Sequence, residues 1–295
     1  MKNALLFPVL LLLPFMLVAQ FATTQFNQFN RMWYENQLLT TDHQVHTAIL
    51  PWRADEVAPF DSRFALLPDS SGTKQKTWLG RKLTHEHLFS FRSEDYELNI
   101  DPVVGMVYGN DSDALAYDAI YQNSRGVRVE GALGDRFSFY TTLVESQARF
   151  SAHVNQKAQR SRVVPGYWRR KNFRNEASDF AYAAGEIAYT APKFFHFRLG
   201  RGKQFIGEGY RSMLISDNSV NYPFFRIETS VGRLKYVNQW AIMNDIREEV
   251  QLADEVFARK YLSMHYLSIY IGKRLNLGLF EGIMRGDSLN RYGID

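Results

Sequence analysis

The sequence contains no cysteine among its 295 residues. This absence excludes disulfides, thiolate metal sites, a thiol nucleophile and a lipid anchor on an N-terminal cysteine. Beyond the first 19 residues, no apolar run approaches the ~20 residues that a membrane-spanning helix needs. The formal net charge is only +4, so charge by itself does not identify a partner.

Motifs of several enzyme classes are also missing. The chain has no Gly-x-Ser-x-Gly elbow and no His-Glu-x-x-His. The glycine-rich stretch 200–212 looks like a nucleotide-binding loop, but Phe197 and Gln204 occupy P-loop positions that require Gly and Ser or Thr. Phe205 stands where a dinucleotide fingerprint needs its third glycine. We therefore expect no catalytic residues and no cofactor.

Two further pairs of polar residues could in principle bind a metal or catalyse hydrolysis. His85 and His87 would share one face of a strand as half of a metal site, but no third ligand can be named. An ordinary polar strand face explains the pair, so we expect no metal. Glu208 and Asp217 leave open the alternative of an envelope glycan hydrolase with an acid and a base.

The beginning of the chain is typical of a secretory signal peptide. Met1-Lys2-Asn3 is followed by an apolar run over residues 4–18 and by the small residue Ala19, the expected cleavage site. A retained membrane anchor is the alternative. Export without disulfides suits a bacterial envelope protein, and it makes nucleic acid a poor partner.

Aromatic residues are abundant, with 22 Phe, 16 Tyr and 5 Trp, while mean hydropathy is negative at -0.31. From Thr84 onward, apolar and polar residues alternate, as in the segments 96–101 and 195–199. Such alternation with many aromatic rings is typical of an outer-membrane barrel, whose strands face lipid on one side and a polar interior on the other. A soluble β-sandwich is the main alternative.

Connection lengths favour the barrel. Short turns are expected at 133–136, 191–193, 231–233 and 273–276, and long segments at 148–179, 202–222 and 243–260. This alternation matches the periplasmic turns and extracellular loops of barrels. Within the last long segment, residues 246–257 carry the pattern of an amphipathic helix.

We therefore predict an all-β fold, a transmembrane antiparallel outer-membrane β-barrel that is truncated at its C-terminus. Residues 1–19 form the signal peptide, 20–83 a periplasmic helical and irregular segment, and 84–295 the partial barrel. In the second part, Phe26, Phe29, Met32 and Trp33 share a helical face, and 54–80 reads as an irregular connector. Roughly ten to twelve strand-like segments follow, and 290–295 lacks a final aromatic strand.

One long connection combines cations with aromatic rings and is the candidate glycan-binding site. Cations can bind the carboxylates or phosphates of acidic sugars, and rings can stack on pyranose faces. A solvated loop among lipopolysaccharide phosphates is the alternative. The candidate residues are Lys157, Arg160, Arg162, Tyr167, Trp168, Arg169, Arg170, Lys171 and Arg174, with Phe173 among them.

The run Gly207-Glu-Gly-Tyr-Arg-Ser-Met-Leu-Ile-Ser-Asp-Asn218, followed by Pro223, resembles the Wzi-like capsule-assembly family of outer-membrane barrels. In that family a Gly-x-Gly turn leads into a strand and then a proline. Segments 200–212, 221–229, 260–268 and 46–51 are similar to its gliding-motility branch, typified by RemB. The motif residues are Gly200, Arg201, Gly202, Lys203, Gln204, Gly207, Glu208, Gly209, Tyr210, Arg211, Ser212 and Asn218.

The resemblance implies a non-enzymatic outer-membrane protein that holds surface or capsular polysaccharide, in capsule assembly and attachment or in gliding motility. Its implied partners are that polysaccharide, outer-membrane lipid and lipopolysaccharide, and gliding or secretion machinery. A porin or solute channel is one alternative, and a glycan hydrolase is the other. We further expect Gly207 and Gly209 to bend the backbone at the outer end of the barrel, where positive φ favours glycine.

Overall fold

The computed structural model describes residues 28–39, 45–57, 77–84, 86–112, 119–174, 176–247, 257–272 and 275–286. The expected signal peptide, the chain end at 290–295 and most of the helical pattern at 246–257 lie outside these ranges.

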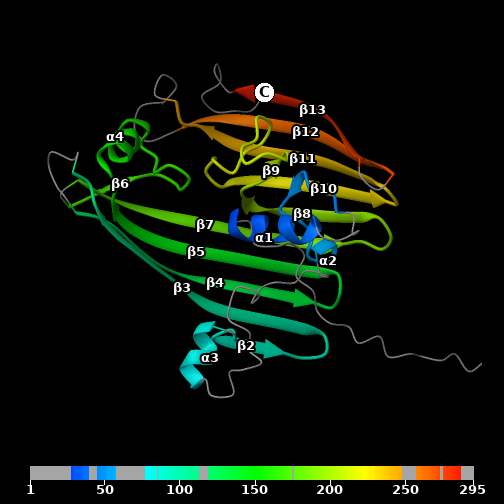
Figure 1. Cartoon of the computed structure of the whole chain (residues 1–295), viewed down its shortest axis with the longest axis horizontal. Helices are drawn as coiled ribbons and strands as arrows, with labels where there is room; N and C mark the ends of the chain where they lie inside the picture. The colour runs from blue at the N-terminus through cyan, green and yellow to red at the C-terminus, as the bar shows by residue number, and fades with distance from the viewer. Residues whose placement is uncertain are drawn as a thin grey trace, which may run out of the picture.

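Eleven strands form one antiparallel sheet, and Figure 1 shows it as a single curved layer running from β13 at the top to β2 at the bottom. The strands along the sheet are β2 (Phe89–Arg92), β3 (Tyr96–Asn110), β4 (Ala119–Leu133), β5 (Phe137–Arg149), β7 (Ala177–Thr190), β8 (Phe195–Gly202), β10 (Tyr222–Val231), β11 (Leu234–Asp245), β12 (Ala258–Ile271) and β13 (Leu275–Gly286), while β6 (Lys171–Phe173) pairs only with β7. The prediction of an all-β antiparallel fold is confirmed. In the described part of the chain, β2 and β13 are the two edges of the sheet.

The lengths of the connections agree with the sequence pattern. Short turns join β4 to β5, β7 to β8 and β10 to β11 at the positions expected. Residues 273–274 of the turn expected at 273–276 lie outside the described residues, and β13 begins at Leu275. These turns lie at one end of the sheet, on the right in Figure 1. The long connections after β5, β8 and β11 are also at the expected positions, and the first of them carries α4 (Ala152–Ser161) and β6 at the other end of the sheet.

Three helices precede the long strands: α1 (Gln28–Leu39), α2 (Ala54–Val57) and α3 (Trp78–Thr84). Helices were expected before the first strand, and the described residues contain these three, while the periplasmic location of the segment stays a prediction. The connector expected at 54–80 is corrected at both ends, because α2 begins it and α3 overlaps its last residues. The first strand of the large sheet begins at Phe89 rather than near Thr84.

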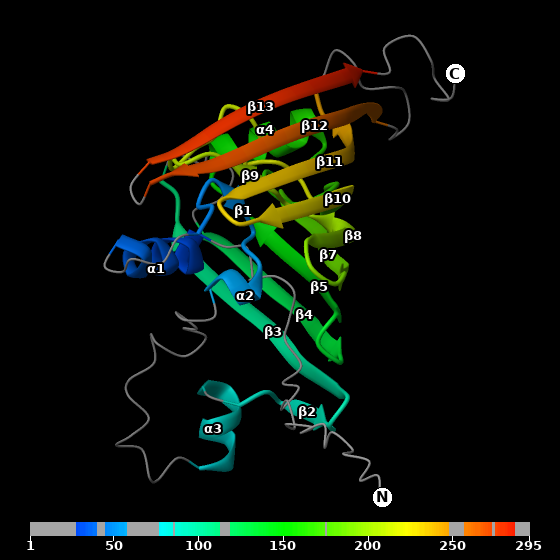
Figure 2. The same cartoon turned by 90° about the vertical axis from the view of Figure 1, so that its right-hand side faces the viewer.

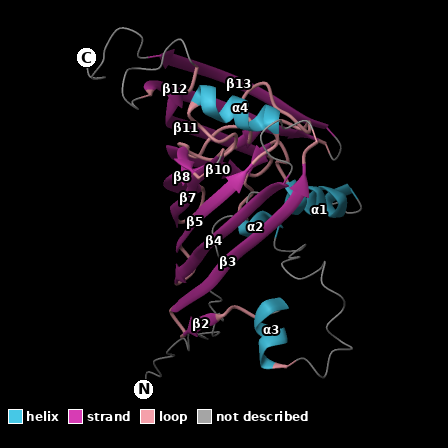
Figure 3. Ribbon diagram, turned by 90° about the vertical axis from the view of Figure 1, so that its left-hand side faces the viewer, coloured by secondary structure: helices cyan, strands magenta, loops and turns pink. Residues whose placement is uncertain are grey.

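A small second sheet covers one face of the large one. Here β1 (Ile49–Leu50) pairs with β9 (Phe205–Ile206), so a segment before the sheet meets a segment between β8 and β10. All four residues are almost fully buried, and Trp52 beside them is only 1% exposed. Figure 2 shows α1, α2 and β1 on this same side of the curved sheet, and Figure 3 shows α1 and α2 there. We call the face packed against β1 and β9 the inner face, and the opposite one the outer face.

The two faces of the sheet differ in what they bury and expose. The inner face buries both charges and an apolar cluster that includes Phe224, Val237 and Leu262. On β10, Arg226 and Glu228 point to this face and are 0% exposed, whereas Phe225 points outward and is 37% exposed. On β11, Lys235 is buried and Trp240 is 40% exposed. Other outer-facing exposed residues include Val104, Met106, Leu143, Ile187, Leu199, Ile242, Leu277, Leu279 and Ile283. Within the described ranges, no helix has the length and apolar content needed to cross a membrane.

Gly200 is the position on β8 where the sheet tolerates no side chain. A Cβ atom there would lie 2.4 Å from the carbonyl oxygen of Gly185 and 2.8 Å from Cα of Glu186 on β7. We predict that Gly200→Ala disrupts pairing of β7 with β8, because backbone atoms must move to admit the methyl group. Thermal unfolding of the purified protein in detergent, followed by circular dichroism, should show a clearly lower midpoint.

Gly202→Ala is the matched control on the same strand. Its Cβ would meet side-chain atoms only, at 3.7 Å from Tyr140 and 3.8 Å from Phe224. These are ordinary contact distances, so its midpoint should stay close to that of the unaltered chain. Equal midpoints for the two variants would contradict the close approach at Gly200.

Candidate functional site

Glu228 is the centre of a network of charged side chains that is buried on the inner face of the sheet. One carboxylate oxygen, Oε1, lies 3.1 Å from Nη1 of Arg198 and 3.0 Å from Nε of Arg226. The other, Oε2, lies 3.0 Å from Nζ of Lys235. Arg198 and Arg226 are direct cross-strand partners on β8 and β10. Because like charges opposite each other repel, Glu228 is what allows both cations to occupy this position.

The network extends at both ends to further carboxylates. Arg198 binds Glu186 on β7 with two hydrogen bonds, Nε to Oε1 at 3.0 Å and Nη2 to Oε2 at 2.7 Å. Lys235 donates to both oxygens of Glu56 on α2, at 2.7 and 3.0 Å. The network thus contains three cations and three carboxylates, and it is neutral as a whole.

Glu56 is the member that lies outside the large sheet, so the network also docks the N-terminal segment 45–57. Arg226 adds to this docking with a hydrogen bond from Nη1 to Gln204 at 2.6 Å and a longer one, of 3.4 Å, to the carbonyl oxygen of Leu50. Burying charges costs several kcal/mol per ion unless each is paired. Release of the segment would uncover this network, and we conclude that the ion pairs bind the segment specifically to this face.

The glycine-rich stretch holds the same segment from the other side. The backbone N–H of Gly207 donates to the carbonyl oxygen of Ala48 at 2.9 Å, and Thr47 donates its hydroxyl to Glu208 at 2.7 Å. The guanidinium of Arg31 in α1 lies 4.3 Å from the centre of the Phe205 ring. Two segments singled out by the sequence resemblance, 46–51 and 200–212, are therefore packed together under the inner face.

The structure corrects two expectations about the stretch, in which Gln204, Phe205 and Ile206 are buried against the inner face. Gly207 does have a positive φ, +148°, whereas Gly209 does not adopt the left-handed region. The strand expected after Gly209 is also absent, since Ile215 alone forms a bridge, to Ile206. The reason is tertiary: the loop turns inward to pair with β1.

The rest of the motif set divides between buried and exposed positions. Gly200 and Gly202 face inward from β8, and Lys203 is partly buried, which lowers the pKa of its ammonium. Tyr210 and Arg211 are exposed, with the guanidinium of Arg211 4.7 Å from the centre of the Tyr210 ring. Ser212 donates its hydroxyl to the carbonyl oxygen of Ile206 and accepts from the N–H of Leu214, and Asn218 donates its N–H to Ser216.

The candidate glycan-binding residues lie together around α4 and β6, at the long-connection end. Five of the cations are exposed and face solvent there: Lys157, Arg160, Arg162, Lys171 and Arg174. Arg162 ends α4 in the left-handed conformation, with φ of 56°, and Arg174 lies over the ring of Phe173 at 5.2 Å. Among the described residues, no ion pair joins any of the five to a carboxylate.

The other members of this set already have partners within the chain. Tyr167 packs against Phe180 at 4.8 Å between ring centres, and Trp168 lies under the guanidinium of Arg201 at 4.7 Å. Arg170 donates to Ser178 at 2.7 Å, and its partial burial lowers the pKa of the guanidinium. Arg169 forms a backbone bridge with Val163. The structure thus brings the cations together at one surface, whereas the rings of Tyr167 and Trp168 are partly buried beneath it.

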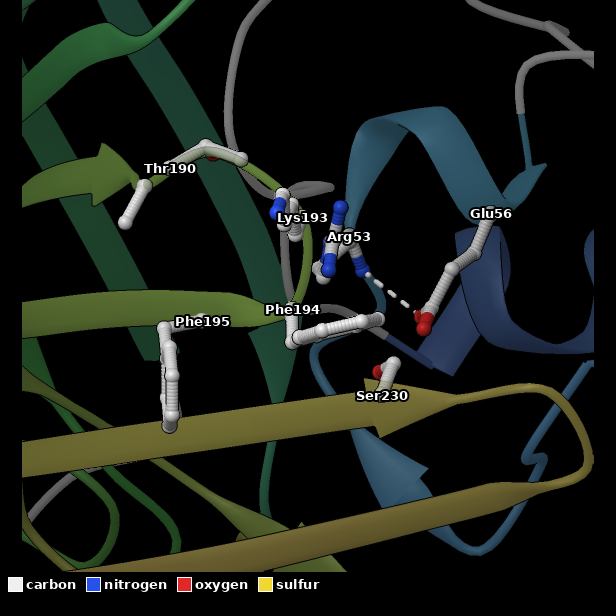
Figure 4. A pocket seen from close by; sticks show the side chains of 8 residues that line it. Arg53, Glu56, Thr190, Lys193, Phe194, Phe195 and Ser230 are labelled. Atoms are coloured by element: carbon white, nitrogen blue, oxygen red, sulfur yellow. Dashed lines mark hydrogen bonds between the residues drawn. The ribbon is translucent and has the colours of Figure 1, made fainter.

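A cavity of about 230 Å³ lies at the opposite, short-turn end. Figure 4 shows Arg53, Lys193 and Glu56 among the residues that line it. Arg53 donates its backbone N–H to Glu56 at 3.3 Å, and that carboxylate also binds Lys235. The cavity therefore adjoins the end of the buried charge network.

Two further candidates were a metal site at His85 and His87 and an acid–base pair of Glu208 and Asp217. His87 lies on an irregular segment, so the expected strand face is wrong, and its Nδ1 is 2.6 Å from Asp101 Oδ2. His85 lies outside the described residues. In the described ranges, no cluster of three or more His, Cys, Asp or Glu residues is arranged to hold a metal. Glu208 accepts the hydroxyl of Thr47, and Asp217 lies 3.9 Å from Arg211.

Comparison with known proteins adds no relative: no family model, no curated protein and no solved structure matches the chain. The resemblance to the Wzi-like family therefore stays a prediction. The membership of Glu56, Glu186 and Lys235 in the buried network was missed by sequence reasoning. Repeated charges on the inner-facing positions were the available signal, but the pairs depend on register between strands.

The Lys235→Met variant tests whether the ion pairs hold segment 45–57 on the inner face. It leaves Glu228 and Glu56 close to each other without the cation that they share. Breaking a buried ion pair in this way costs about 3–5 kcal/mol. We predict faster proteolytic cleavage within 45–57, measured by mass spectrometry of limited digests. Arg81→Gln, which removes an exposed pair with Glu86 at 3.0 Å near α3, is the control and should change little. Unchanged cleavage in Lys235→Met would contradict the docking role.

His46 makes the docking sensitive to pH. Its Nδ1 lies 2.7 Å from Ser268, and its ring packs against Tyr270. Burial, assisted by the charge of Lys235 and opposed by Glu228, lowers the pKa of His46 from 6.5 to about 4. The undocked segment takes up a proton below about pH 6.5, whereas the docked one resists until about pH 4. Docking therefore weakens as pH falls from 6.5 to 4, by about 1–2 kcal/mol at pH 5.

Amide hydrogen exchange within 45–57, corrected for intrinsic rates, should be faster at pH 5 than at pH 7. In His46→Gln, which keeps a hydrogen-bonding group toward Ser268, this pH dependence should disappear. An equal dependence in both proteins would show that another group is responsible.

Proposed function

We propose that this protein is a non-enzymatic outer-membrane β-barrel protein that holds surface polysaccharide at its long-connection end, in capsule attachment or gliding motility. The observation that carries the proposal is the mainly apolar exposed face of the sheet, opposite a covered face that holds buried charges. An apolar exposed face is what strands need when their outside meets lipid. The signal-peptide pattern at 1–19 supports the same location.

The exposed cations support the choice of ligand. Lys157, Arg160, Arg162, Lys171 and Arg174 project from the end of the sheet that carries α4 and β6, where the proposed barrel would face the cell exterior. Guanidinium and ammonium groups bind carboxylates and phosphates with charge-assisted hydrogen bonds. An acidic capsular polysaccharide or lipopolysaccharide phosphate offers such groups. The resemblance of 200–218 to the Wzi-like family points to the same class of ligand.

The covered inner face favours a holding role over transport. Segment 45–57 and residues 203–221 occupy the side of the sheet that would line a pore. A polar interior filled by protein conducts poorly, unlike the open lumen of a porin. Gliding or secretion machinery would contact the protein at the opposite, periplasmic end.

Removing exposed cations tests whether this surface binds an acidic polysaccharide. We predict that Lys157→Gln, Arg160→Gln and Lys171→Gln together weaken binding to alginate, an acidic polysaccharide, by about 10–100-fold, since each lost contact removes roughly 0.5–1 kcal/mol. Binding of the full chain in detergent micelles would be measured by biolayer interferometry, with dextran as the neutral comparison. The affinity should also fall with rising salt.

The matched control removes three exposed cations at the short-turn end, in Arg136→Gln, Lys193→Gln and Arg233→Gln. It changes the net charge equally and should leave alginate binding unaltered. Equal losses in both triple variants would reduce the effect to net charge and contradict the proposed surface. Absence of the chain from the outer-membrane fraction would contradict the barrel, and a steady large conductance in planar bilayers would favour the channel.

A further inference from the structure

Near the middle of β11, β12 and β13, the largely apolar outer face carries a polar row. Asn238 on β11 is the cross-strand partner of His265 on β12, and His265 is the partner of Glu281 on β13. All three point outward, in the middle of their strands. Along the same strands their outer-facing neighbours are largely apolar: Tyr236 and Trp240 beside Asn238, Leu267 beside His265, and Leu279 and Ile283 beside Glu281.

The neighbouring strands are apolar at the corresponding height. The outer-facing residues in the middle of β8 and β10 are Phe195, Phe197, Leu199, Phe225 and Ile227.

Other ionisable residues on the outer face are either paired or close to strand ends. Arg125 and Glu145 form an ion pair with each other at 3.2 Å. Arg201, Arg259 and Arg285 lie near the ends of β8, β12 and β13. The row on β11 to β13 is therefore a local feature of one end of the sheet.

The row presents a fixed base beside an acid. His265 Nδ1 lies 2.6 Å from Asn238 Oδ1 and 3.0 Å from the hydroxyl of Tyr236, and its ring stacks on that of Tyr236 with a centroid distance of 6.1 Å. These contacts orient the imidazole and leave Nε2 to bind another group. In the described part of the chain, no hydrogen bond or ion pair engages the exposed carboxylate of Glu281.

We infer that this row is the contact surface for a second copy of the chain. The inference rests on the proposed function, because an unpaired carboxylate in the middle of a face that meets lipid is unfavourable. In a two-fold interface each surface meets itself. An axis running between β12 and β13 would set His265 of each copy against Glu281 of the other. The imidazole of each copy would then face the carboxylate of the other, so the row can meet itself across a two-fold axis.

The absence of cysteine makes a direct test possible. Ile283→Cys introduces a single thiol beside the row, and Ile187→Cys introduces one on β7, also on the outer face, with exposed fractions of 64% and 51% for the native residues. Membranes carrying the full chain would be treated with a short bis-maleimide. We expect a band at twice the chain mass for Ile283→Cys and none for Ile187→Cys.

Charge exchange then separates acid–base pairing from loss of local structure. Added to Ile283→Cys, His265→Glu places acid against acid across the axis, and cross-linking should fall at least about tenfold. The double exchange His265→Glu and Glu281→His loses the same contacts to Asn238 and Tyr236 but restores a base opposite each acid. Cross-linking should therefore recover.

Three results would overturn the inference: no cross-link above that of Ile187→Cys, a product whose mass identifies a different protein, or equal cross-linking in the single and double charge variants. Outer-membrane fractionation and alginate binding, measured on the same samples, separate this failure from a failure of the proposed function. A chain that reaches the outer membrane and binds alginate without cross-linking contradicts the second copy alone. A chain absent from that membrane contradicts both.

Discussion

The arrangement of the inner face depends on the ion pairs of Glu228. Two arginines on neighbouring strands and a lysine on a third converge on this one carboxylate, at 3.0–3.1 Å. Such cations are unfavourable without a carboxylate between them, and the carboxylate is unfavourable without them. The register that aligns β8, β10 and β11 therefore also places each buried cation beside a carboxylate. A shift in this register would leave buried charges unpaired.

The network also explains why a short segment far away in the chain becomes part of the fold. Glu56 supplies the third carboxylate, and Leu50 and Gln204 supply oxygens for Arg226. The segment is thus bound by the face that it covers. The opposite, outer face stays uncovered and mainly apolar, and this exposed apolar face is what supports the proposed location.

Much of the fold could be predicted because strand alternation has a period of two and depends on local sequence. Tyr96 to Asp101 and Phe195 to Leu199 show which residues share a face without any knowledge of their neighbours. Turn positions followed from Gly, Pro and charged residues between such runs. The site was harder. Tyr167 and Trp168 were expected to stack on sugars, yet both pack within the chain, because the loop folds back on β7 and β8.

The sequence by itself determined the antiparallel strands, their two faces, the alternation of short and long connections, and the location of the cationic loop. These properties depend on residues close together in the chain. Only the tertiary structure decided that Glu56 meets Lys235, that residues 46–51 pack on the glycine-rich stretch, and that this stretch turns inward. Each of these contacts joins residues more than 150 positions apart, so it depends on strand register and on chain path, which local patterns do not encode.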